Sequence, residues 1–103
     1  MSVKLLMNWN IKPGRDQDYF EFVVREWGPG ISKLGIELSG LWYTAYSVDT
    51  SRPQIMAEAI AEDLPTMHRI LDSAEWKSLH AKLLDNVSGY AQKVVRVTGD
   101  FQL

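Results

Sequence analysis

The chain of 103 residues contains no cysteine. Disulfides, thiolate nucleophiles, thiolate metal sites and iron–sulfur clusters are therefore excluded. The formal net charge is only −2 and no block of five like charges occurs, so the basic surface that neutralises nucleic-acid phosphates is missing. No apolar run approaches the roughly 20 residues of a membrane-spanning helix, and the first ten residues lack a signal-peptide pattern. The sequence predicts a cytoplasmic protein that binds neither nucleic acid nor membrane.

The composition is that of a folded chain. Hydrophobic residues make up 46% of the sequence and charged residues 23%, which is ordinary for a globular protein. No linker, low-complexity segment or repeat divides the sequence. Residues 1–103 are therefore expected to form a single domain.

The hydrophobic periodicity predicts alternating strands and helices. Strands are expected where apolar residues recur at every second position, at 3–9, 36–48, 54–62 and 90–97. Helices are expected at 16–27 and from Pro65 to about Val87, with a break at Asp72-Ser73. This order predicts an α+β, ferredoxin-like βαββαβ domain, with a four-stranded antiparallel sheet and helices on one face.

Local signals place the ends and buried faces of the helices. The first helix is expected to bury the stripe Phe20, Val23, Val24 and Trp27. Pro29 should stop or kink this helix, and a short further turn should carry Ile31 and Leu34 and close at Gly35. Asp72 and Glu75 have the spacing of a capping box, and Gly89 is expected to end the last helix.

The second sheet face is too apolar to be left in water. The strand at 36–48 is expected to carry Leu38 and Trp42 on one side and Leu41 and Tyr43 on the other. Exposing several such side chains forfeits on the order of 5–10 kcal/mol, which is comparable to the stability of a small domain. A second copy related by a two-fold axis is the simplest cover, so we expect a homodimer whose sheets meet face to face.

Two segments carry a family resemblance. IKPGRDQDYFEF (11–22) and LDSAEWKSLHAKL (71–83) resemble the strand-to-helix junction and the broken last helix of the dimeric α+β barrel superfamily, especially antibiotic biosynthesis monooxygenase-like domains. The resemblance implies a dimer of ferredoxin-like protomers, each with a pocket between sheet and helices. Members include cofactor-free quinone-forming monooxygenases, haem-degrading enzymes and lactone isomerases, so the fold does not select a reaction.

Haem degradation fits the residues poorly. Haem-degrading members use an asparagine on the first strand and a tryptophan and a histidine on the last helix. His80 matches the expected histidine, and Asn8 lies near the expected asparagine. The position ten residues before His80 is Ile70 instead of tryptophan. The sequence therefore predicts neither a haem group nor another bound cofactor, and no metal site.

The candidate site residues have both structural and functional interpretations. His80 interrupts an apolar helical face, either as a hydrogen-bonded core residue or as a base in a pocket. Asn8 either satisfies strand-edge hydrogen bonds or aims its amide at a substrate. We expect His80 and Asn8 as catalytic groups, and Trp27, Trp76 and Tyr43 around a small apolar or aromatic, polyketide-like ligand. The function expected is ligand binding, with cofactor-independent oxygenation or isomerisation and a non-catalytic accessory role as alternatives.

The four tryptophans leave one further question open. Trp9, Trp27, Trp42 and Trp76 could converge on one aromatic pocket for a flat ligand. The alternative is that they are distributed between core and dimer interface.

Overall fold

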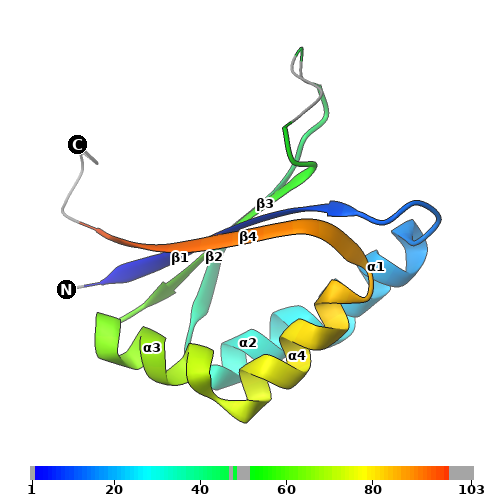
Figure 1. Ribbon diagram of the computed structural model, residues 1–103. Helices are drawn as coiled ribbons and strands as arrows, with labels where there is room; N and C mark the ends of the chain where they lie inside the picture. The colour runs from blue at the N-terminus through cyan, green and yellow to red at the C-terminus, as the bar shows by residue number, and fades with distance from the viewer. Residues whose placement is uncertain (1, 47, 49–51, 98–103) are drawn as a thin grey trace.

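The computed structural model describes residues 2–46, 48 and 52–97, and its elements follow the predicted order (Figure 1). The elements are β1 (Val3–Ile11), α1 (Asp16–Phe22), the π-helix η1 (Val23–Trp27), α2 (Gly28–Leu34), β2 (Glu37–Tyr43), β3 (Ile55–Ala61), α3 (Leu64–Asp72), α4 (Ala74–Leu84) and β4 (Val87–Arg96). The antiparallel sheet has the strand order β2-β3-β1-β4, and all helices lie on one of its faces. The predicted ferredoxin-like architecture is confirmed.

The core lies between the sheet and the helices. Burial alternates along β1, where Val3, Leu5, Met7 and Trp9 are buried and the residues between them are half-buried. β3 repeats the pattern, because Ile55 and its three alanines are also buried. Because side chains alternate between faces with a period of two, the intervening residues lie on the second face of the sheet, called the open face below.

The first helical arm buries two of the four predicted residues, Val23 and Trp27. Tyr19 and Phe22 are buried, whereas Phe20 is 45% exposed and Val24 71% exposed. The buried positions 19, 22, 23 and 27 and the predicted positions 20, 23, 24 and 27 both have helical spacing. Periodicity alone therefore fits both stripes and does not choose between them.

Pro29 does not stop the helix, because η1 continues directly into α2. The π-turn lies immediately before Gly28-Pro29, and the Gly28 N–H donates to the Val23 carbonyl. A proline ring clashes with the carbonyl four residues earlier in a regular α-helix, and the wider turn accommodates it. The short turn carrying the buried Ile31 is confirmed, as is Gly35, which closes α2 at φ 103°.

The last helix is broken where predicted, but by another cap. Ser73 Oγ accepts a hydrogen bond from the Trp76 N–H at 3.2 Å and donates one to the Ile70 carbonyl at 2.6 Å. The predicted capping box of Asp72 and Glu75 is wrong, because Asp72 is the last residue of α3. Ser73 holds its own backbone extended (φ −70°, ψ 150°), which is the conformation a capping residue needs.

Two bulges correct the strand assignments. The helix ends at Leu84, and Gly89 (φ 63°) lies within β4, opposite Trp9, where the register shifts between Asn8 and Asn10. A second shift between Leu38 and Gly40 puts Leu38 on the helix side together with Leu41, so its predicted grouping with Trp42 is wrong. The strand predicted at 36–48 ends at Tyr43, and residues 47 and 49–51 lie outside the described residues.

Candidate functional site

Trp9 is the centre of an aromatic cluster between the sheet and the helices. Its indole makes an edge contact with Trp27 (ring centroids 5.6 Å apart, 79°) and stacks on Tyr90 (5.8 Å, 12°). Trp9 Nε1 donates to the Tyr19 hydroxyl at 3.0 Å. Trp9 and Trp27 are fully buried and Tyr19 is 1% exposed, so the first half of the cluster is closed to water.

His80 joins the cluster from α4. Its imidazole packs against the Tyr90 ring (4.5 Å, 70°), and Trp76 stacks on its other side (5.5 Å, 12°). Ring contacts therefore run without interruption from Trp76 to Trp27. Three of the four tryptophans belong to this cluster, while Trp42 lies on the open face beside Met56.

Two buried ring nitrogens in the cluster have no hydrogen-bond partner among the described residues. Trp27 Nε1 and His80 Nδ1 are both buried and unpaired. A buried polar atom without a partner costs about 1–3 kcal/mol, and most such atoms in native proteins are paired. The two atoms are therefore free to bond to a molecule that enters the cluster.

The titratable groups of the cluster are held in their neutral forms. Burial lowers the pKa of His80 below its ordinary value. Burial raises the pKa of Tyr19 to about 12, although the hydrogen bond from Trp9 opposes this shift, and burial also raises the pKa of Tyr90. Neutral phenols and a neutral imidazole suit hydrogen bonding to an uncharged ligand, because desolvation penalises ionic forms.

The structure brings together only some of the predicted site residues. Trp27, Trp76 and His80 meet through Trp9 and Tyr90, as described above. Asn8 does not join them, because it alternates with buried residues of β1 and lies on the open face, opposite Ala91.

Tyr43 also lies apart from His80. It is 52% exposed at the end of β2, and its ring contacts Phe20 of α1 (6.3 Å). It is connected to the cluster only through the ring contact between Phe20 and Tyr19 (5.0 Å).

Sequence reasoning missed the residues that connect the cluster, namely Trp9, Tyr19 and Tyr90. Trp9 was considered only as one of four tryptophans that could converge on a pocket, and nothing in the sequence linked it to Tyr19 or Tyr90. The signal that could have found Tyr90 is Gly89, because an isolated glycine in a strand pattern indicates a bulge. The bulge places two β4 residues opposite one residue of β1, and Tyr90 stacks on Trp9 there.

A groove of about 490 Å³ lies between α2 and α4. It is lined by Gly30, Lys33, Leu34, Ala74, Glu75, Ser78, Leu79 and Lys82. Leu34 and Leu79 also pack against the core. A Cβ added at Gly30 would lie 2.7 Å from Leu79 Cδ2, so glycine is required for the present position of Leu79.

Residues 2–46, 48 and 52–97 contain neither a cluster of metal ligands nor a membrane-spanning helix. Within these ranges, no three histidine or carboxylate side chains gather as metal ligands would. The helices of the same ranges are too short or too polar to cross a membrane.

Comparison with known proteins identifies the fold. No family model and no curated protein matches the chain. Among solved structures, it is similar to an EthD family protein from Bacillus halodurans (TM-score 0.75, 17% identity, 95% of this chain and 100% of that one). It is also similar to a NIPSNAP family protein from Agrobacterium tumefaciens (0.70, 15%, 97% and 89%).

A third similar structure is a dimeric ferredoxin-like protein of unknown function from Thermobifida fusca (TM-score 0.68, 10% identity, 94% of this chain and 92% of that one). At these identities the likeness concerns the fold and not the activity. The chain shares the ferredoxin-like fold of these structures, which is the fold that the two sequence motifs predicted.

Proposed function

We propose that the protein is a homodimer that binds a small, flat, uncharged molecule in the aromatic cluster between sheet and helices. The ligand class is an aromatic or polyketide-like compound with a carbonyl or phenol group. Trp27 and Trp76 contribute aromatic surface, while Trp27 Nε1 and His80 Nδ1 contribute the polar contacts. The cytoplasmic location predicted from the sequence belongs to the same proposal.

The observation that carries the proposal is the pair of buried, unpaired nitrogens in an aromatic site. Ligand pockets are mostly apolar, with a few placed polar groups that fix orientation. A carbonyl oxygen can accept from the Trp27 N–H, and a hydroxyl group can bond to the neutral His80 imidazole. Such a ligand would satisfy atoms that the protein alone leaves without a partner.

The groove between α2 and α4 is the proposed route of entry. Its volume of about 490 Å³ lies within the usual range for small-molecule sites. Leu34 and Leu79 belong both to the groove and to the layer packed on the core. Rotamer changes of these two side chains would therefore open the core towards the groove.

A second candidate function is cofactor-independent oxygenation or isomerisation of the same ligand. Its supporting observation is His80, whose lowered pKa keeps the imidazole neutral near pH 7, as a general base requires. The base would take a proton from a phenol or from the carbon next to a carbonyl. Asn8 has no part in this step, because it lies on the other face of the sheet.

Fluorescence titration with a panel of quinols and aromatic ketones tests ligand binding. We expect saturable quenching by at least one member, and an affinity about 3–10-fold lower in Trp27→Phe, which loses one hydrogen bond but keeps a ring. Trp42→Phe on the open face is the matched control and should bind as the wild type does. Absence of saturable binding, or equal affinity in Trp27→Phe, would contradict the proposal.

Turnover separates the enzyme from the non-catalytic alternative. Consumption of a bound quinol that is lost in a stably folded His80→Ala variant supports catalysis. Binding without consumption supports an accessory role. Haemin is included in the panel, and a shifted Soret band on mixing would favour the haem-degrading members of the superfamily instead.

A further inference from the structure

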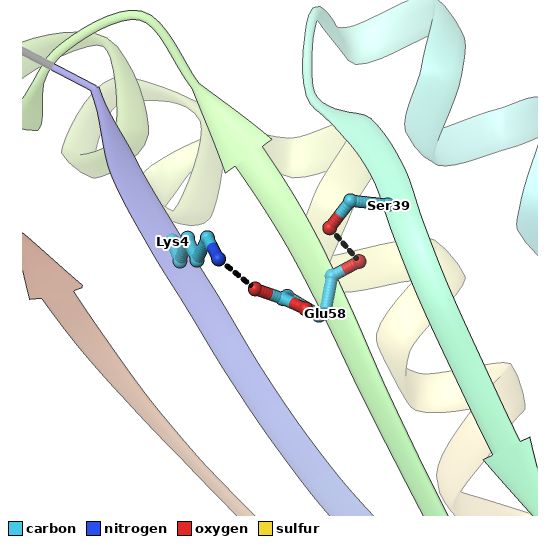
Figure 2. Close-up of polar contacts among 3 residues, drawn as sticks. All are labelled: Lys4, Ser39 and Glu58. Carbon is cyan, nitrogen blue, oxygen red and sulfur yellow. Dashed lines mark hydrogen bonds and ion pairs between the residues drawn. The ribbon is translucent and has the colours of Figure 1, made fainter. Parts of the chain in front are cut away.

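The open face of the sheet divides into two halves of opposite charge. Glu37 and Glu58 lie on β2 and β3, whereas Lys4 and Lys93 lie on β1 and β4. Figure 2 shows Lys4 and Glu58 as an ion pair on this face, with the helices behind the sheet, and Ser39 Oγ donating to the Glu58 carbonyl at 3.2 Å. The acidic half and the basic half therefore meet along the middle of the sheet.

A protruding side chain and a hollow lie on opposite edges of this face. The Trp42 indole is 54% exposed and covers Gly40, where a Cβ would collide with its ring. On the other edge, between β1 and β4, a hollow of about 210 Å³ is lined by Leu6, Asn8, Ala91, Gln92 and Lys93.

The strand register places these two features at the same height. Trp42 pairs with Met56, Met56 with Asn8, and Asn8 with Ala91, so these four residues form one row across the sheet. The next row runs from Gly40 through Glu58 and Leu6 to Lys93. The indole and the hollow therefore each span the same two rows.

We infer that two copies stack their open faces about a two-fold axis parallel to the strands, with Trp42 of each seated in the hollow of the other. This inference rests on the proposed homodimer and specifies its geometry. Such an axis places β2 of one copy over β4 of the other, and β3 over β1. Each row of one copy then lies over the same row of the other. Relative rotation of the stacked sheets by about 30° shifts the edges by about one residue, which is less than the two rows of the hollow.

Charge selects this axis over the alternative. An axis across the strands would place β2 on β2 and β3 on β3, so that the acidic half of one copy would face the acidic half of the other. The axis parallel to the strands places the acidic half of one copy on the basic half of the other, as complementary interfaces require. An interface of this kind uses the same patch on both subunits, and Asn8 becomes part of the seat for the partner's indole.

Trp42→Ala tests the contact through the dimer dissociation constant, measured by sedimentation. Buried interface tryptophans are often hot spots, so we expect a constant raised about 30-fold or more. Ala91→Phe fills the hollow from below and should weaken the dimer as well, and adding Trp42→Ala to it should restore part of the affinity. The control is Phe20→Ala, an exposed aromatic residue on the helix side, which should leave the constant unchanged.

Cross-linking tests the axis, because the chain has no cysteine of its own. Glu37 and Val95 end one row at opposite edges, roughly 14 Å apart at the usual strand spacing. After subunit exchange between Glu37→Cys and Val95→Cys, a short bismaleimide spanning the roughly 10 Å between stacked sheets should join the two variants. Neither variant should cross-link to itself.

The outcomes separate the inference from the function it rests on. Self-linking of Glu37→Cys, or a wild-type dimer with no cross-link and no effect of Trp42→Ala, overturns the inferred geometry but leaves a dimer. A wild-type chain that is monomeric at micromolar concentration overturns the proposed homodimer itself. Cross-linking only in the mixture, together with weakened Trp42→Ala, supports the inference.

Discussion

The two faces of the sheet use the same strands in different ways. On the helix side, Trp9 and its neighbours find their packing partners within one chain, and two buried ring nitrogens of the described residues stay unpaired. On the open side, Trp42 and Met56 are about half exposed. The hollow that we propose as the seat of Trp42 lies on the opposite edge of the same face. We therefore propose different roles for the two faces: a ligand site on the helix side and a protein interface on the open side.

The largest effect on stability is expected from removing a large buried side chain on the helix side. Trp9→Ala removes the central ring of the cluster and should lower the free energy of unfolding by about 3–5 kcal/mol, measured by urea denaturation. The loss should not depend on protein concentration, because Trp9 is fully buried within one chain. The destabilisation by Trp42→Ala should depend on concentration, since it acts through association. Equal concentration dependence in both variants would remove the distinction between the faces.

An intermediate effect is expected at the ion pair on the open face. Glu58→Gln leaves Lys4 without its charged partner, which should weaken dimerisation by about 2 kcal/mol or more if the pair is buried between two sheets. In a free protomer the same pair would contribute less than about 1 kcal/mol. Sedimentation of the variant measures the difference.

Glu21→Gln is the matched control for the ion pair. Glu21 pairs with Arg25 at 3.7 Å on the exposed surface of the first helical arm, away from the sheet. Its loss should leave dimerisation unchanged. A wild-type dissociation constant in Glu58→Gln would mean that the Lys4–Glu58 pair stays in water.

The smallest effect on the free energy of unfolding is expected from pH, and it should arise from His80 on the helix side. Burial lowers the pKa of His80 in the folded state below its ordinary 6.5, so the unfolded chain binds the proton more readily. The contribution of His80 to stability is therefore fully present above about pH 6.5, decreases as the pH falls below this value, and levels off once the folded form is also protonated. Urea unfolding between pH 5 and 8 measures the slope.

Two variants test whether His80 causes the change of stability with pH. His80→Phe keeps an aromatic ring between Trp76 and Tyr90 and should flatten the dependence on pH. His68→Gln removes the other histidine, which is exposed on α3, and should leave the dependence as it is in the wild type. A slope that persists unchanged in His80→Phe would contradict the assignment.

The fold could be predicted because it depends on periodicity. Alternation along β1 and β3, Pro65 at the start of α3 and the break near Ser73 are all local in sequence. The errors arose where periodicity is ambiguous or interrupted. The first helical arm has two apolar stripes of helical spacing, and the buried one runs through Tyr19 and Phe22. The bulge in β2 moved Leu38 to the helix side.

The site was harder to predict because it depends on contacts between distant segments. Trp9 and Tyr90 meet only through the pairing of β1 with β4 and the bulge at Gly89. Asn8 seemed a partner for His80 by analogy with related sites, but its neighbour Trp9 takes the helix-facing position. Alternation along a strand allows only one of two adjacent residues to face the helices.

Sedimentation equilibrium of the wild-type chain at micromolar concentration tests the central claim most directly. The account predicts a mass of twice the 11.7 kDa of one chain, because a second copy covers the open face. A mass of one chain, with Trp42 and Met56 still in water, would contradict it.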